Sequence, residues 1–82
     1  MKEENLKQRI TSIMKEEKLK EGTKIIYNGD NYVINGEIVG LADNGNPVVG
    51  YNYIIKILEF VGERSYNYSC TVLPRLMFDI VD

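Results

Sequence analysis

The sequence predicts a mainly β domain with one helix, in which an N-terminal amphipathic α-helix precedes a compact five-stranded antiparallel β barrel. Residues 2–21 contain no proline or glycine. Beyond Gly22 the composition changes to Ile, Val, Tyr and Thr interrupted by Asn and Gly, which is typical of strands separated by tight turns. Because 82 residues can bury one core but not two, we expect a single domain over residues 1–82, with the helix in 1–21 and the barrel in 22–82.

The N-terminal segment carries an apolar stripe at helical spacing, formed by Leu6, Ile10, Ile13 and Met14. Residues at this spacing project from one face of a helix. Asn5, followed three residues later by Gln8, has the spacing of a capping box. Leu19 falls outside the stripe, so either the helix ends before it or Leu19 turns back onto the barrel. Gly22 is expected to end the segment in the left-handed conformation.

A helix of about 15 residues is marginal in water without a packing partner. The apolar stripe therefore needs one, and the sequence leaves two alternatives open. The stripe either docks on the barrel of its own chain, or it pairs with a second copy in a homodimer.

The strands are expected at about 24–28, 31–41, 47–60, 65–73 and 77–81. The turns between them are expected at Asn28-Gly29, within 43–47, and within 61–64, where the sequence offers residues that tolerate positive φ. Pro74 should stop the fourth strand because it cannot donate to a ladder, and a single helical turn should follow it.

The third and fourth strands should pair around a two-residue turn at 62–63. That register places Tyr53 opposite Val72, Ile55 opposite Cys70 and Ile57 opposite Tyr68, all on one face with Ile38 in the same core. The other face would expose Ile54, Leu58 and Phe60, which is too apolar for bare solvent. Either a bulge shifts the register or the N-terminal helix covers that surface.

Segments at 22–26, 36–40, 53–56, 72–74 and 76–77 resemble small SH3-like barrels related to KOW-type modules from Gram-positive bacteria and their phages. The resemblance covers roughly residues 22–82 and consists of core positions and turns. It implies an SH3-like barrel, a fold whose members bind proteins, peptides or nucleic acid. This chain departs from the nucleic-acid binders because it lacks basic loop residues.

Charge and composition narrow the classes of function. The net charge is −2, and residues 22–82 carry four Lys and Arg against seven Asp and Glu. An acidic barrel is a poor match for nucleic-acid phosphates, which favour a positive patch. No segment has the roughly 20 apolar residues of a membrane span, and the first residues do not resemble an export signal. Together with a single cysteine, these features predict a cytoplasmic protein.

The residues present argue against catalysis. The chain contains no histidine, so the commonest general base and metal ligand is missing. With one cysteine, no thiolate zinc site can form. Cys70 is expected to be a buried, unreactive side chain. We therefore expect no catalytic residues, no metal and no cofactor.

Six tyrosines without tryptophan are the one hint of a recognition surface. The expected binding residues are Tyr51, Tyr53, Tyr66 and Tyr68, with Arg64 and Arg75 beside them to pair with an anionic group. Tyr51 and Tyr53 share a strand face, as do Tyr66 and Tyr68, and the expected register brings both pairs onto one side of the sheet. The alternative is that these tyrosines fill the barrel.

The leading hypothesis is a non-catalytic module that binds a protein partner, such as a small phage-encoded inhibitor or adaptor. The alternative is a nucleotide- or nucleic-acid-binding protein that uses the tyrosines, including a phage counter-defence protein that sequesters a signalling nucleotide between protomers. The second hypothesis requires positive potential near the tyrosines.

Overall fold

The computed structural model describes residues 5–63 and 68–81. Its elements are helix α1 (Leu6–Met14), strands β1 (Lys24–Asn28), β2 (Tyr32–Asn46), β3 (Gly50–Gly62) and β4 (Cys70–Pro74), the 3₁₀ turn η1 (Arg75–Met77), and strand β5 (Asp79–Ile80). Within the described residues, no helix has the length and apolar character needed to cross a membrane.

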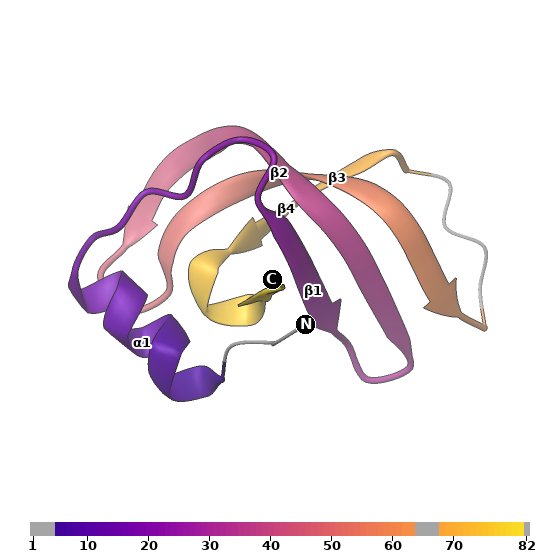
Figure 1. The fold of residues 1–82 in the computed structure, drawn as a ribbon, viewed down its shortest axis with the longest axis horizontal. Coiled ribbons are helices and arrows are strands. Elements are labelled where there is room, and N and C mark those ends of the chain that lie inside the picture. The colour runs from indigo at the N-terminus through magenta and orange to yellow at the C-terminus, as the bar shows by residue number, and fades with distance from the viewer. Residues whose placement is uncertain (1–4, 64–67, 82) are drawn as a thin grey trace.

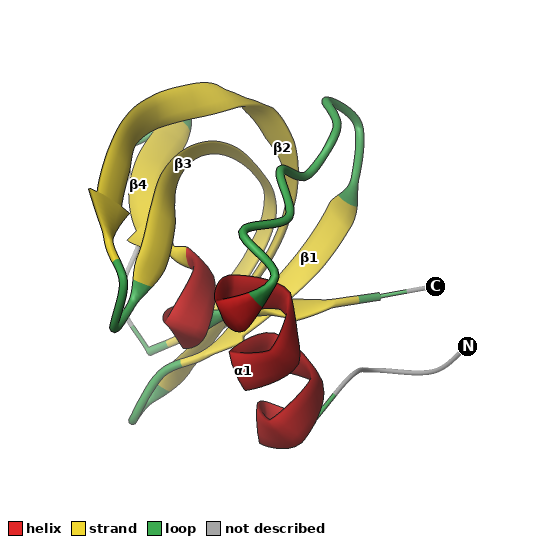
Figure 2. Cartoon of the chain, turned by 90° about the vertical axis from the view of Figure 1, so that its left-hand side faces the viewer, coloured by secondary structure: helices red, strands yellow, loops and turns green. Residues whose placement is uncertain are grey.

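The five strands form one antiparallel sheet in the order β4-β3-β2-β1-β5. The long strands β2 and β3 bend, so that the sheet curls around η1 and β5, while α1 lies across the open end (Figures 1 and 2). In the described part of the chain β4 pairs only with β3, and β5 only with β1. The predicted five antiparallel strands and single helix are confirmed, but the sheet is not closed.

Bulges bend β2 and β3 and settle which side chains face inward. Glu59 pairs with Asn35 while Ile57 pairs with Gly36, so Leu58 is an extra residue on β3. Because of the extra residue, the alternation of inward and outward side chains along β3 shifts by one position after Leu58. Phe60 therefore faces Ile34 on the same side of the sheet on which Ile55 faces Ile38. This bulge lies between β2 and β3, whereas the expected bulge was to shift the β3–β4 register, which is continuous over the described pairs. Helix α1 does not cover the Leu58 side chain, which is 49% exposed.

The predicted register between β3 and β4 is wrong by one residue. Tyr53 pairs with Leu73 rather than Val72, and Ile55 pairs with Thr71 rather than Cys70. A shift of one residue moves every side chain of a strand to the opposite face. Cys70 is accordingly exposed rather than buried, and Ile57 donates its N–H to Ser69 instead of facing Tyr68.

Helix α1 is shorter than predicted. The capping box between Asn5 and Gln8 is present at its start, but its last residue is Met14 and Glu16 has a positive φ of 53°. Leu19 then turns back and packs against the core, as one of the two alternatives stated. Gly22 is left-handed with a φ of 86°, but it lies in the turn before β1 instead of ending the helix.

Two hairpin turns also differ from expectation. Neither Asn28 nor Gly29 has positive φ, and Gly29 closes the β1–β2 turn by donating its N–H to the Tyr32 carbonyl. Strand β2 continues to Asn46 before it turns. The Asn46 carboxamide accepts the N–H groups of Val48 and Val49 and thereby organises that turn. The third turn, expected within 61–64, reaches Arg64, which lies outside the described residues, whereas the stop at Pro74 followed by η1 is confirmed.

The core lies inside the curled sheet. Its fully buried members include Ile25, Ile38, Tyr53, Ile55 and Phe78, which come from β1, β2, β3 and the residue before β5. The predicted core positions Ile38 and Ile55 are confirmed. The burial of Phe78 between η1 and β5 explains why the C-terminal segment lies within the curve of the sheet (Figure 1).

Candidate functional site

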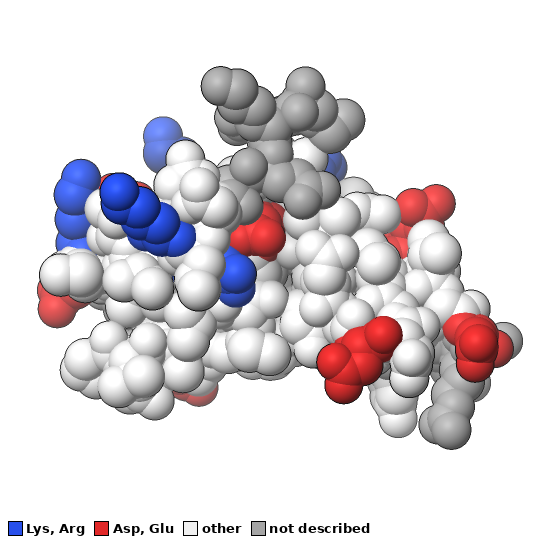
Figure 3. All heavy atoms as spheres, turned by 90° about the horizontal axis from the view of Figure 1, so that it is seen from below, with Lys and Arg blue, Asp and Glu red and all other residues white. Residues whose placement is uncertain are grey.

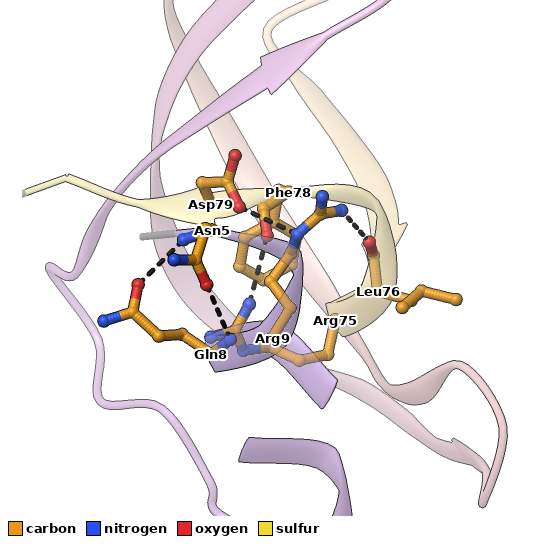
Figure 4. A network of polar contacts seen from close by, with 7 residues as sticks. All are labelled: Asn5, Gln8, Arg9, Arg75, Leu76, Phe78 and Asp79. Carbon is orange, nitrogen blue, oxygen red and sulfur yellow. Dashed lines mark hydrogen bonds and ion pairs between the residues drawn. The ribbon is translucent and has the colours of Figure 1, made fainter. Parts of the chain in front are cut away.

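Helix α1 is fixed to the C-terminal segment by polar contacts. The Arg9 guanidinium pairs with Asp79 at 2.8 Å and donates to the carbonyl of Leu76. Figure 4 shows these contacts between α1, η1 and β5 beside the capping box at the start of the helix. Both charged side chains are largely shielded from solvent, so the pair holds the helix against the open end of the sheet.

The two sides of α1 have different roles. Ser12 is buried. Ile13 packs closely on Gly50, and a β-carbon added to Gly50 would lie 2.9 Å from the Ile13 side chain. Leu6, Ile10 and Met14, spaced four residues apart, are exposed instead, and Met14 is 78% exposed. Of the four stripe residues, only Ile13 therefore docks on its own chain. Leu6, Ile10 and Met14 form an unpartnered apolar stripe within the described structure, which we call the α1 stripe.

A groove of about 580 Å³ lies between the end of α1 and the β2–β3 hairpin. Its lining includes Met14 from the helix, Pro47 and Gly50 from the hairpin, Tyr51 from β3, and Arg75 from η1. Glu16, Glu17 and Lys18 contribute charge to the same lining. The volume is in the range of small-molecule and peptide-side-chain pockets, and we call it the α1–hairpin groove.

Two of the predicted binding tyrosines support one wall of this groove. Tyr53 is 1% exposed and belongs to the core. Its hydroxyl accepts the N–H of Leu19 and donates to the carbonyl of Glu17, and burial raises the pKa of its phenol. Tyr51 packs edge-on against Tyr53 with a centroid separation of 6.3 Å. Tyr53 thus positions both the segment after α1 and the Tyr51 ring.

The exposed side of the Tyr51 ring meets a cation. The Lys18 ammonium lies 5.7 Å from the centroid of the ring, within cation–π range. Tyr51 is only half-buried and lines the groove. It is therefore the predicted binding tyrosine that the structure places in contact with both the core and the groove.

Arg75 is placed differently from expectation. It lines the groove but is only 1% exposed. Its guanidinium donates to the carbonyl of Phe78 at 3.0 Å and lies 5.2 Å from the centre of the Phe78 ring. Figure 4 shows that Arg75 and Phe78 approach each other beneath α1. Arg75 contributes to the floor of the groove while it also organises η1.

The remaining predicted binding residues do not join this group. Tyr68 is 71% exposed and lies near the far end of the β3–β4 ladder, next to Ser69, which accepts the Ile57 N–H. The expected clustering of Tyr51, Tyr53 and Tyr68 on one face therefore does not occur, because it depended on the register that is off by one. Arg64 and Tyr66 lie outside the described residues.

The resolved pKa shifts of titratable groups outside the groove have local causes. No group of three or more potential metal ligands comes together in the part of the chain that the structure describes. The ion pair with Lys24 lowers the pKa of Glu37, but both side chains lie on the surface. The hydrogen bond with Tyr32 is the main cause of the raised pKa of Tyr27. These shifts follow from local pairing on the sheet.

Local sequence patterns do not reveal the hairpin side of the groove. They predict Pro47 and Gly50 only as parts of a turn and a strand, and they do not mark Ser12 as a site residue. Gly50 has a φ of 81° and would meet both Ile13 and Arg75 if it carried a side chain. Its glycine is required by that close approach, a long-range contact that local sequence patterns do not encode.

Comparison with known protein families, with curated proteins and with solved structures finds no match to this chain. The candidate site therefore depends on the chain's own geometry.

Proposed function

We propose that this chain is a non-catalytic interaction module that binds a segment of a partner protein on the α1 stripe and in the α1–hairpin groove. The observation that carries the proposal is the position of Met14, which belongs to both surfaces. An apolar ridge of a partner could lie along Leu6 and Ile10 and insert a side chain beside Met14. Helix faces with apolar positions at this spacing are a common mode of protein recognition.

The charges around the groove support a polypeptide ligand. Glu16, Glu17 and Lys18 place both signs of charge on its lining, whereas a polyanion would favour cations alone. Figure 3 shows one face of the molecule, on which residues other than Lys, Arg, Asp and Glu occupy much of the area and both signs of charge are present.

The fold assignment belongs to the same proposal. Five antiparallel strands with one helical turn between the fourth and fifth support an SH3-like architecture. The absence of histidine from the sequence supports a non-catalytic role. Folds of this kind serve many functions, so the site carries the functional argument.

A second candidate is a small anionic ligand with a ring, such as a nucleotide. Lys18 over the Tyr51 ring, with Arg75 also in the lining, places an aromatic surface and positive charge in one groove. The carboxylates of Glu16 and Glu17 in the same lining oppose a phosphate. This candidate therefore ranks below the protein partner.

Site-specific photo-crosslinking tests the first candidate. A photoreactive residue at Met14 should give a discrete protein adduct in host lysate, whereas the same residue at Val61 should not. Val61 is also exposed but pairs with Val33 at the opposite end of the β2–β3 ladder. The adduct at position 14 should disappear with Ile10→Asp. Equal adducts at both positions would contradict the proposal, and a small anionic adduct in native mass spectrometry that is lost with Lys18→Met would favour the second candidate.

A further inference from the structure

Strand β4 is an edge strand of the described sheet. Its five residues pair with β3 on one side, and no other described segment pairs with it. It is drawn at the back of the curled sheet in Figure 1, away from β5 in the strand order. An uncovered edge offers main-chain hydrogen-bonding groups to another strand.

The hydrogen-bonding phase of β4 follows from one bond. Ile57 donates its N–H to the carbonyl of Ser69 at 2.8 Å. In an antiparallel ladder the residues that bond to the neighbour alternate along the strand, so Thr71 and Leu73 direct their main-chain groups toward β3. Cys70, Val72 and Pro74 consequently direct theirs toward the open edge. Pro74 has no N–H to offer, which suits an edge position.

The sequence of β4 provides little protection against pairing. Residues 68–74 include no charged side chain, and the β3–β4 register is continuous without a bulge. Proteins commonly block open edges with lysine, proline, inward-pointing charge or bulges, and of these β4 has only Pro74, at its last position. Val72 instead presents an aliphatic side chain that is 52% exposed at the middle of the strand.

We propose that two copies of this chain form a dimer by antiparallel pairing of β4 with β4, about a two-fold axis at Val72. In this register the two Val72 residues exchange N–H and carbonyl groups. Each Cys70 N–H then meets the carbonyl of Pro74 in the second copy, whereas each Cys70 carbonyl receives no N–H from that residue, because proline has none. The strand is thus complementary to itself, as a two-fold interface requires.

The side chains of β4 also favour pairing with a second copy of the same strand. Val72 pairs with Ile54, which pairs with Gly40 on the next strand. Two copies joined at Val72 would continue this row across the axis without placing a charge beside a charge. Thr71 of each copy would lie opposite Leu73 of the other. The Thr71 side chain would then further shield Leu73, which already packs against the core of its own chain. This inference is independent of the α1–hairpin groove.

Sedimentation of the whole chain with matched variants tests the dimer. Val72→Lys should raise the dissociation constant at least tenfold, because two like charges would meet at the axis. Val61→Lys is the control, since it makes the same change at a valine of similar exposure, 54% against 52%. Val72→Pro should also dissociate the dimer while leaving the ladder to β3 intact, because the lost N–H faces the open edge.

Cross-linking tests the register. The double variant Cys70→Ser with Val72→Cys should form a disulfide-linked dimer on mild oxidation, since directly opposed residues lie about 5.5 Å apart between α-carbons. The unmodified chain should not, because the two Cys70 residues would be roughly 14 Å apart. A chain that remains monomeric at all concentrations, a dimer that resists both Val72 variants, or efficient cross-linking through Cys70 would each overturn the proposal. Dissociation by Met14→Asp with no effect of Val72→Lys would overturn it in favour of the α1 stripe.

Discussion

Strands β4 and β5 both lie at an edge of the same sheet, but they are protected to different degrees. β5 contains two residues, and its Asp79 is held by Arg9 from α1. β4 contains five residues, and no described segment contacts its open edge through a strand pairing. A short strand with a buried charge pair discourages further pairing, whereas a longer uncharged strand permits it.

The two edges of the sheet are thus protected from further strand pairing by different means. Helix α1 pairs Arg9 with Asp79 of β5, packs Ile13 against Gly50 of the β2–β3 hairpin, and keeps the α1 stripe exposed. One element thus both closes an edge and presents a surface. The opposite edge is left to the main chain of β4, so the two candidate interfaces lie on different parts of the molecule.

The largest loss of stability is expected from a substitution in the core that β1 and β4 share. Ile55 is 0% exposed and pairs with Ile38 on one side and Thr71 on the other. Ile55→Ala should lower the free energy of unfolding by about 2–5 kcal/mol, because it leaves a cavity in a packed core. Urea denaturation measures this loss, and hydrogen exchange should accelerate in β1 and β4 together.

The exposed Val61→Ala is the matched control for this core substitution and should change stability far less. Faster exchange confined to β4 in the Ile55 variant would show that the two edges do not share one cooperative core.

Much of this architecture could be predicted from local sequence patterns. The bounds of β1, the stop at Pro74, the capping box at Asn5 and the core positions Ile38 and Ile55 each follow from a pattern of a few residues. Such features depend on local propensity, on capping and on the two-residue period of a strand. They required no knowledge of long-range packing.

The register of β4 and the C-terminal end of α1 could not be predicted, because they depend on contacts distant in sequence. Leu58 forms a bulge on β3 opposite Asn35 and Gly36 of β2, and the residues next to it on β3 include no glycine. Glu16 takes a left-handed conformation, which is uncommon for a side chain of its kind. The error in register then changed the faces of Cys70 and Val72, and with them the expected clustering of the tyrosines.

Replacing Arg9 should destabilise the β5 edge of the sheet without affecting β4. Arg9→Met keeps the apolar stem but leaves Asp79 shielded without its cation, and we expect a loss of about 1.5–3 kcal/mol, typical of a hydrogen bond to a charged group. Amide exchange should accelerate in α1 and around Asp79 while β4 keeps its protection. Hydrogen exchange with mass spectrometry measures both regions in one experiment.

Lys24→Met is the control for Arg9→Met, because Lys24 forms the more exposed ion pair with Glu37. Exposed pairs contribute little to stability, so this variant should change the unfolding free energy much less. An equal loss in the two variants would show that the Arg9 pair does not close the β5 edge more firmly than a surface bridge.

The smallest effect concerns the segment that links α1 to β1. Tyr53→Phe removes the hydroxyl that contacts Leu19 and Glu17 and should cost about 0.5–1.5 kcal/mol. Burial raises the pKa of the Tyr53 phenol, so the unfolded chain loses this proton first as the pH rises. The stability contributed by neutral Tyr53 is therefore complete below the ordinary tyrosine pKa of about 10, and it declines as the pH rises toward the folded value.

The difference in unfolding free energy between the native chain and Tyr53→Phe should consequently narrow above this pH. Tyr51→Phe is the control, since it removes the same atom from a ring that is only half-buried. Comparing each variant with the native chain at every pH cancels the contribution of Tyr27, whose pKa is also raised. A difference that stays constant across the alkaline range would mean that Tyr53 does not lose its proton more readily in the unfolded chain, and that the tether between α1 and the sheet depends on the ring alone.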